Sequence, residues 1–535
     1  MKNLLKNLAL MALILAVASP VFAAKAKAWK VNKDGTADIE LWYGAAVTEA
    51  GPPPADWIAY KIIKEKLGIN LILTALPSND NDQDTKINAA GAANALPDIF
   101  MVSDRVLPML VKQGLVADVT NMYKMMPNRT AKLYDKDAIA FSTINGKSFA
   151  LAQPGTIARN EGVLIREDWL KKLGLSVPKT TDEYFNVMKA FTEKDPDGNG
   201  KNDTWGFGAY LEVGDVNEGL GKRFDPIMGA FGVAGTWNLT KSGFGLNIMK
   251  PEFYDAMQYV KKLVDEKVID PNWTAYKKDD FRASWKQGKF GIFREQNAAY
   301  ASESNYAPFD QNFPNGGFLI IDPPVGPSGK SSCGTYTVAY RMYALAAATA
   351  GSTAKINGKK VTKMEKIAEL LEWMSSDEGY YLLGWGQKGV NYVFDANGIP
   401  TVKGIPDASK GYSKPEMQPL TQLRNLVYYN SDIELGARYP TYTTVASKKE
   451  MSALKALREM QSKAWTPNVG NALLPKPDAD LKRFYEQGVL EFLTGRRELT
   501  KANWDAWTSD FYNKMGGKAW EDEARKVAEA NRLLK

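Results

Sequence analysis

Apolar and polar positions in the first hundred residues follow two different periods. Residues 38–43 alternate, which predicts a half-buried strand, and 69–75 predicts a second strand. The segment 57–67 has helical spacing, and 84–94 is a predicted helix of small residues. The nearly continuous apolar run at 96–102 is typical of a strand buried in a parallel sheet. This βαβαβ order predicts an open α/β sheet.

Aromatic and charged side chains stand where two of these strands end. Trp42 and Tyr43 close the first strand, and Asp104 and Arg105 follow the third. Ligands of open α/β sheets bind at the carboxyl ends of the strands. We therefore expect these four residues near a binding cleft.

The chain is expected to pass between two lobes three times. The first crossing is predicted at 154–161, the second at the strand 288–293 and the third at the small-residue segment 347–360. The strands at 317–321 and 335–346 are assigned to the first lobe. The expected plan is a signal peptide at 1–23, an N-terminal α/β lobe of 24–155 and 296–352, and a C-terminal α/β lobe of 156–295 and 353–535 that ends in a helical extension.

An acidic loop follows a predicted amphipathic helix in the middle of the chain. Its oxygen-bearing residues occupy alternate positions, with Gly200 sixth: Asp195, Asp197, Asn199, Lys201 and Asp203. EF-hand loops place side-chain oxygens at positions one, three and five, a carbonyl at seven and a glycine at six. The pattern favours a calcium loop, although Gly206 replaces the bidentate glutamate usual at position twelve. A solvated turn rich in Asp, Asn and Gly is the alternative.

Composition excludes several classes of site. The chain has 535 residues, 44% hydrophobic and 24% charged, which is ordinary for a globular protein of two or three domains. The net charge of +7 is spread along the chain, so we expect no nucleic-acid partner. No histidine is present, which excludes His-dependent triads and His-ligated zinc. The single cysteine, Cys333, excludes an intrachain disulfide.

The N-terminus has the three parts of a signal peptide. Lys2 and Lys6 precede an apolar run at 8–17, and the small-x-small pattern at 21–23 predicts cleavage near Ala23. No cysteine follows the run, so lipidation is not expected. We expect an exported, periplasmic protein.

Several short motifs occur together along the mature chain. They are Leu96–Ile99, Asn145–Leu151, Arg166–Leu170, the acidic loop at 195–203, and Leu493–Gly495 followed by Trp504. With the signal peptide, this set resembles extracellular solute-binding protein family 1, the sugar-binding branch of ABC importer proteins, and above all its calcium-carrying alginate-binding periplasmic members. The resemblance implies an α/β, two-lobe periplasmic-binding-protein fold (type II) with an interlobe cleft, a three-crossing hinge and an extended helical C-terminal region. It also implies a monomer that binds a carbohydrate and delivers it to the membrane permease subunits of an ABC transporter.

The resemblance also implies a structural Ca²⁺ away from the ligand cleft. The alginate binders carry an acidic residue just after the last aspartate of the loop, and Thr204 stands there in this chain. The expected metal set is therefore Asp195, Asp197, Asn199, Lys201, Asp203 and Thr204.

Sugar binding needs flat rings that stack on pyranose faces and polar groups that hydrogen-bond hydroxyls. The aromatic candidates lie at predicted strand ends or in Gly-rich loops, and each could equally belong to a core: Trp42, Tyr43, Trp237, Tyr380, Trp385 and Trp465. Arg159 in the first crossing and Arg294 just after the second are expected to face the hinge cleft. Arg294 could equally be a structural ion-pair partner. A cleft arginine would suit an acidic sugar.

Two other functions remain open on the residues alone. A secreted carbohydrate-active enzyme could work with paired carboxylates and no histidine. The adjacent Glu167 and Asp168 invite that interpretation, but acids at a helix start are favoured by the helix dipole, and we expect no enzyme. A binding protein for peptides or another small solute is the other alternative.

Overall fold

The structure is a computed structural model. It describes residues 29–44, 52–77, 80–153, 157–211, 219–336, 341–356, 358–411, 423, 426–427, 431–467, 474–531 and 533–534. The expected signal peptide at 1–23 lies outside these residues. No helix within them is long and apolar enough to cross a membrane.

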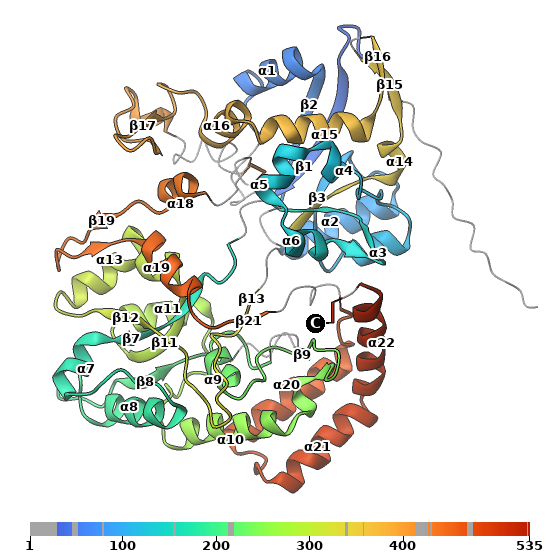
Figure 1. Cartoon of the computed structure of the whole chain (residues 1–535). Helices are drawn as coiled ribbons and strands as arrows, with labels where there is room; N and C mark the ends of the chain where they lie inside the picture. Colours follow the sequence, from blue (N-terminus) through green and yellow to red (C-terminus); the bar gives the residue numbers. More distant parts are fainter. Residues whose placement is uncertain are drawn as a thin grey trace, which may run out of the picture.

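The described residues form two lobes, each built on its own sheet (Figure 1). The first sheet has the order β2 (Ile69–Leu76), β1 (Ala37–Gly44), β3 (Ile99–Ser103), β14 (Arg341–Leu345) and β6 (Leu151–Ala152). β1 pairs in parallel with β2 and β3, as the βαβαβ pattern predicts, whereas β14 returns antiparallel to β3. Every residue of β3 and β14 is buried.

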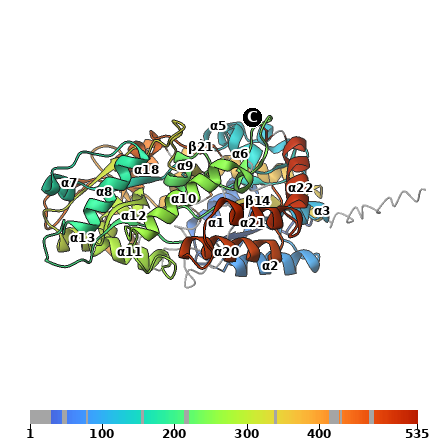
Figure 2. The ribbon, with the colours of Figure 1, turned by 90° about the horizontal axis from the view of Figure 1, so that it is seen from below.

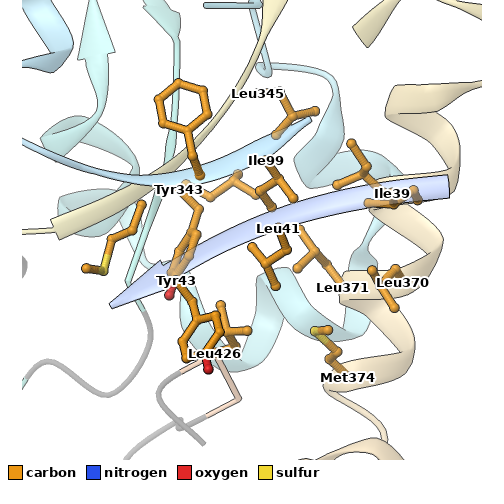
Figure 3. Packing of buried hydrophobic residues seen from close by; sticks show 14 of the residues in the cluster. Ile39, Leu41, Tyr43, Ile99, Tyr343, Leu345, Leu370, Leu371, Met374 and Leu426 are labelled. Atoms are coloured by element: carbon orange, nitrogen blue, oxygen red, sulfur yellow. The ribbon is translucent and has the colours of Figure 1, made fainter. Parts of the chain in front are cut away.

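Helices cover both faces of this sheet and complete the first core. The helices and small strands of this lobe are α1 (Ile58–Leu67), α2 (Asp80–Ala92), α3 (Leu107–Lys112), α4 (Met122–Met125), α5 (Pro127–Leu133), α6 (Lys136–Phe141), β4 (Thr143–Ile144), β5 (Lys147–Ser148), α14 (Ala347–Ala350), β15 (Thr353–Ile356), β16 (Lys359–Thr362), α15 (Lys363–Met374), α16 (Asp377–Trp385), β17 (Val393–Phe394) and β18 (Pro400–Thr401). Leu41 of β1 packs toward Leu371 and Met374 of α15 (Figure 3). Burial of these side chains is the main force that holds the lobe together.

The second sheet has the order β12 (Phe318–Ile321), β7 (Glu161–Arg166), β11 (Phe290–Gln296) and β8 (Trp205–Gly208). β11 is antiparallel to β7 and parallel to β8. Helix α8 (Thr181–Glu193) starts with a capping box formed by Thr180 and Glu183 and lies directly on β8. A Cβ on Gly206 of β8 would lie 2.0 Å from the carbonyl oxygen of Met188, so this close approach requires glycine.

The rest of the second lobe is mainly helical. Its remaining elements are α7 (Glu167–Leu173), α9 (Asp225–Ala230), β9 (Trp237–Asn238), β10 (Gly245–Leu246), α10 (Pro251–Asp265), α11 (Lys278–Lys286), α12 (Asn297–Ala301), α13 (Glu303–Asn312), α19 (Ala453–Gln461), α20 (Ala479–Thr494), α21 (Lys501–Asn513) and α22 (Gly517–Ala530). The three C-terminal helices share one core with α8 and α10. Figures 1 and 2 both place them at the opposite end of the lobe from α7 and α8.

Three parts of the expected domain plan are corrected by the strand pairing and the core contacts. β11 is an inner strand of the second sheet rather than a crossing, and β12, expected in the first lobe, pairs with β7. Helices α15 and α16, expected in the second lobe, pack in the first core. The chain therefore returns to the first lobe between Tyr336 and Arg341, and leaves it again between Val427 and α19. Helix α18 (Asp432–Arg438) lies in this last connection.

Candidate functional site

Side chains from the first two connections between the lobes meet side chains of the second lobe in one group. The guanidinium carbon of Arg159, from the first connection, lies 5.5 Å from the ring centre of Tyr336. Tyr336 ends β13 (Thr335–Tyr336), which pairs in parallel with β21 (Thr466–Pro467). The Tyr336 ring is perpendicular to Trp465, with 6.3 Å between centres, and Arg294 lies 5.5 Å from the Trp465 ring. We call these four residues the crossing cluster.

The two aromatic rings of the crossing cluster are only half-buried. The indole N–H of Trp465 donates to the carbonyl of Met460 at 3.0 Å. Because that bond uses the only polar atom of the indole, the exposed part of the ring offers an apolar face. A flat apolar face beside hydrogen-bond donors is the arrangement that a pyranose ring requires.

Arg159 has an unusual backbone conformation. Its φ is +57°, in the left-handed region, which costs a non-glycine residue about 1–2 kcal/mol. The neighbouring peptides are anchored to the second lobe: Gln461 donates to the carbonyl of Ala158 at 3.1 Å, and the amide of Asn297 donates to the carbonyl of Asn160 at 2.9 Å. These two bonds hold Arg159 in place, and its side chain remains exposed.

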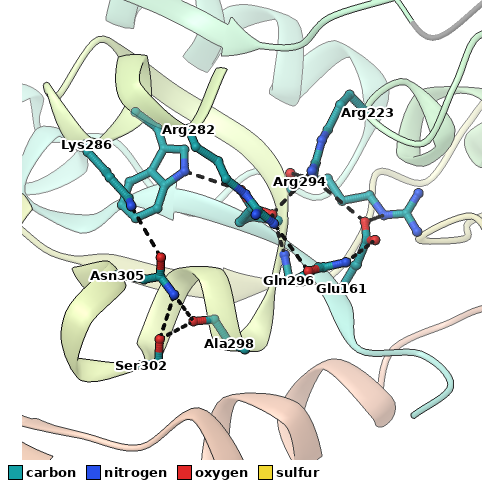
Figure 4. Close-up of polar contacts among 11 residues, drawn as sticks. Glu161, Arg223, Arg282, Lys286, Arg294, Gln296, Ala298, Ser302 and Asn305 are labelled. Carbon is teal, nitrogen blue, oxygen red and sulfur yellow. Dashed lines mark hydrogen bonds and ion pairs between the residues drawn. The ribbon is translucent and has the colours of Figure 1, made fainter. Parts of the chain in front are cut away.

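Arg294, which lies beside the Trp465 ring, belongs to a buried ion-pair network (Figure 4). Its side chain is 2% exposed and lies 3.2 Å from Glu161 and 2.8 Å from Asp225. It also donates to the carbonyl of Lys222 at 2.6 Å. With these partners, Arg294 is a structural ion-pair residue, which is the alternative that the sequence left open.

Two more arginines complete the network. Arg223 lies 3.3 Å from Glu295 and 3.7 Å from Glu161, and Arg282 pairs with Glu295 at 3.1 Å. Burial alone would raise the pKa of Glu161, but Arg294 and Arg223 outweigh it and lower that pKa to about 2. Glu161 is thus ionised at neutral pH, and all three carboxylates, Glu161, Asp225 and Glu295, are paired with arginines.

Trp42, Asp104 and Arg105 form a second group at the carboxyl edge of the first sheet. The indole N–H of Trp42 donates to Glu40 at 2.7 Å, and the Lys86 ammonium lies 4.8 Å from its ring. Arg105 pairs with Asp84 of α2 at 2.8 Å. Burial raises the pKa of Asp104 despite the opposing charge of Lys476, a residue of the second lobe. Trp42 and Arg105 thus contact α2 rather than the connections between the lobes.

The other four aromatic candidates lie in the cores, the alternative that the sequence left open for each. Tyr43 and Trp385 are 1% and 0% exposed in the first core. Tyr380 is buried in the same lobe and donates to Glu434 of α18. Trp237 is buried in the second core, where it stacks on Phe244. Their rings pack against protein and offer no open face to a sugar in this structure.

Sequence reasoning missed Tyr336, Glu161, Asp225 and Arg223. Tyr336 lies at the start of the strand predicted at 335–346, and the local pattern does not show that Thr335 and Tyr336 pair with β21. Glu161 and Asp225 look like ordinary surface acids in the sequence. Only a buried arginine opposite them, on β11, distinguishes them from such acids.

The acidic loop folds back on its own amides. Asp195 accepts from the amides of Gly198, Asn199 and Gly200 at 3.0–3.1 Å. The Asn199 side chain donates to Asp197 at 2.8 Å and to Asp203 at 3.0 Å. Burial and the neighbouring Asp195 raise the pKa of Asp197, so the carboxylates repel one another. In the described part of the chain, no three acidic, Cys or His groups are arranged to hold a metal ion.

The donor chemistry of the loop nevertheless fits calcium. Three carboxylates, one carboxamide and a backbone carbonyl are the hard oxygen donors that Ca²⁺ prefers. Gly198 and Gly200 take φ values of +79° and +75°, which supply the sharp turn. The Thr204 hydroxyl donates instead to the carbonyl of Phe191 at 2.9 Å and is buried, so its side chain is removed from the expected metal set.

The adjacent acids Glu167 and Asp168 are both engaged in ion pairs. Buried Arg166 holds Asp168 with two bonds of 2.9 and 2.6 Å. Glu167 pairs with Lys171, one turn along α7, at 2.5 Å. Their contacts are those of a helix start rather than of an acid and nucleophile that face a substrate.

Residues 51–381 match the family model of bacterial extracellular solute-binding proteins. The polygalacturonan/rhamnogalacturonan-binding protein YtcQ of Bacillus subtilis is 26% identical over 486 residues, which cover 87% of this chain and 86% of that protein. An "HMO binding" ABC-transporter-associated solute-binding protein of Bifidobacterium longum infantis has a TM-score of 0.65 at 17% identity, covering 94% of this chain and 100% of that one. The alginate-binding protein AlgQ2, in a structure without calcium ion, has a TM-score of 0.59 at 17% identity with the same coverage. The fold is thus the two-lobe type II periplasmic-binding-protein fold, and the chain belongs to the bacterial extracellular solute-binding protein family, as its motifs implied.

Proposed function

We propose that this protein captures an oligosaccharide and delivers it to the membrane permease of an ABC importer. The observation that carries the proposal is the half-buried pair of Tyr336 and Trp465 at the connections between the lobes. A pyranose ring stacked there would touch chain segments that lead into both lobes. Such a ligand binds a closed arrangement better than an open one, and only that difference in affinity can drive closure.

The relatives are consistent with this ligand class. YtcQ and AlgQ2 are named for polysaccharides, and the Bifidobacterium protein is named as an HMO-binding protein. Peptides would need partners for their backbone amides, and the apolar face of Trp465 offers none.

Titration calorimetry with the purified protein against a panel of neutral and acidic oligosaccharides and short peptides tests the proposal. We expect at least one oligosaccharide to bind and Trp465→Ala to weaken it at least tenfold, which is about 1.4 kcal/mol. Trp373→Ala is the matched control, because Trp373 is also half-buried but lies on α15 and donates to Glu378. Binding of peptides alone, or release of shortened sugar products during the titration, would overturn the proposal.

We also propose that the acidic loop binds a structural Ca²⁺. The side chains of Asp195, Asp197, Asn199 and Asp203 and the carbonyl of Lys201 would hold it. The bound cation would neutralise three mutually repelling carboxylates between α8 and β8. The proposed role of the ion is structural, because the loop belongs to the second lobe and follows the helix that packs on the sheet of that lobe.

The proposed location is the periplasm, where the protein acts as a monomer after cleavage near Ala23. The apolar run of the leader contains no cysteine at its end, which supports a free rather than a lipid-anchored chain. Intact-mass measurement of the exported protein tests both points. A mass increase from acyl chains would refute the free form.

A further inference from the structure

The buried arginines near the crossing cluster are balanced by carboxylates. Arg294 pairs with Glu161 and Asp225, while Arg223 and Arg282 pair with Glu295. A buried ion that is paired in this way has no charge left for a ligand. The charges of this network therefore balance one another beside Trp465.

Arg159 is different, because no described carboxylate pairs with it. Its one described side-chain contact is the Tyr336 ring, 5.5 Å from the guanidinium carbon. The attraction between a cation and a ring at an exposed site is weak, and it orients the group without neutralising it. The N–H edges of a guanidinium stacked in this way stay available for a planar acceptor.

The backbone supports a role beyond stability. A left-handed arginine is less stable than a glycine would be at the same position, and exposed side chains seldom need such a conformation. The peptide bonds on both sides are nevertheless tied to α19 and to the start of α12. The fold thus fixes the backbone of a cation that has no carboxylate partner among the described residues, and it does so beside the two half-buried rings.

We infer that Arg159 binds a carboxylate of the sugar, and that the ligand is therefore an acidic oligosaccharide built from uronate units. This inference rests on the proposed function and adds the chemical class of the ligand. Arg159 recognises the planar carboxylate with its two N–H edges while Trp465 and Tyr336 contact the apolar faces of the sugar rings. A neutral sugar presents only hydroxyls to the arginine and leaves its charge unmatched.

The test compares charged and uncharged forms of the same sugars. Calorimetry at neutral pH uses a panel of uronate trisaccharides, their methyl esters and neutral trisaccharides. The key variant is Arg159→Asn, because asparagine tolerates a left-handed backbone and the change removes the guanidinium and its positive charge. Arg159→Lys keeps the charge but loses the paired N–H edges. Arg483→Gln removes an exposed arginine of α20 that pairs with Asp480, and serves as the control.

We expect the wild type to bind one uronate at least tenfold more tightly than its methyl ester. Arg159→Asn should lose that difference and leave binding of the ester unchanged, Arg159→Lys should keep part of it, and Arg483→Gln should keep it all. The inference would be overturned if Arg159→Asn lost affinity equally for the uronate and its methyl ester. It would also be overturned if the wild type bound neutral sugars but no uronate. Either result would leave the proposed function intact. Failure of every saccharide to bind would overturn both. Thermal unfolding of each variant shows whether it folds, and the lysine variant keeps the test valid if the asparagine variant does not.

Discussion

Glu161 and Arg294 form a buried ion pair on neighbouring antiparallel strands, with 3.2 Å between the Glu161 Oε2 and the Arg294 Nε. Glu161 opens β7, next to the first connection between the lobes, and Arg294 lies on the neighbouring strand β11. The Arg294 guanidinium also lies 5.5 Å from the centre of the Trp465 ring, which we propose as a sugar platform.

Replacing Arg294 should strongly destabilise the second lobe. Arg294→Met leaves Glu161 and Asp225 buried near each other with one arginine fewer, and uncompensated buried charges of this kind cost about 3–5 kcal/mol. Urea denaturation followed by tryptophan fluorescence measures the change in the free energy of unfolding. Arg483→Gln, which breaks an exposed pair, should leave that free energy nearly unchanged. A similar small effect for both variants would contradict the structural role of Arg294.

Glu161 should make the free energy of unfolding depend on pH in the acidic range. Its pKa is about 2 in the folded protein against an ordinary value of 4.5, so the folded state favours the ionised form. The resulting stabilisation is complete above about pH 4.5 and is lost as the pH falls toward 2. At about 1.4 kcal/mol for each pKa unit, the loss is on the order of 3 kcal/mol.

The comparison of wild type with Glu161→Gln isolates this contribution. All other carboxylates titrate in both proteins, so the difference in unfolding free energy between them should shrink between pH 5 and pH 2. Chemical denaturation at several pH values measures it. A difference that stays constant over that range would refute the prediction.

Gly334 should not tolerate a side chain. Its φ is +124°, and a Cβ there would lie 2.3 Å from the Asp225 carboxylate, which would be pushed away from Arg294. Gly334→Ala should therefore destabilise the protein by more than about 2 kcal/mol. Gly329→Ala is the matched control: its φ is +73°, but nothing lies within 4 Å of the added carbon. Equal effects of the two changes on thermal unfolding would show that backbone strain alone matters.

Calcium should stabilise the protein by binding the folded acidic loop. A ligand that binds only the folded state raises stability by about 2.7 kcal/mol at a hundredfold excess over its Kd. We expect EDTA to lower the Tm, excess Ca²⁺ to restore it, and Asp203→Asn to abolish the response. Asp265→Asn, an exposed acid of α10 that pairs with Lys261, should respond as the wild type does. Metal analysis that finds no calcium, together with an unchanged Tm in EDTA, would rule out the site.

Local sequence determined those helices, strands and loops that depend on interactions between residues close together in the chain. The alternation in β1, the buried run of β3, the helix before the acidic loop and the loop spacing all follow from side-chain periods of a few residues. The motifs also carried the family resemblance, and the match to residues 51–381 confirms the family.

Only the tertiary structure decided which lobe each strand joins and which side chains meet. β11 and β12 are apolar runs that would fit either sheet, and their hydrogen-bond partners on β7 lie far away in the sequence. Tyr336 and Trp465 come together because β13 pairs with β21, and Arg294 is buried because Glu161 and Asp225 face it. Such contacts depend on pairing between segments that lie far apart in the sequence. The pattern of apolar and polar residues in one segment does not identify the segment with which it pairs.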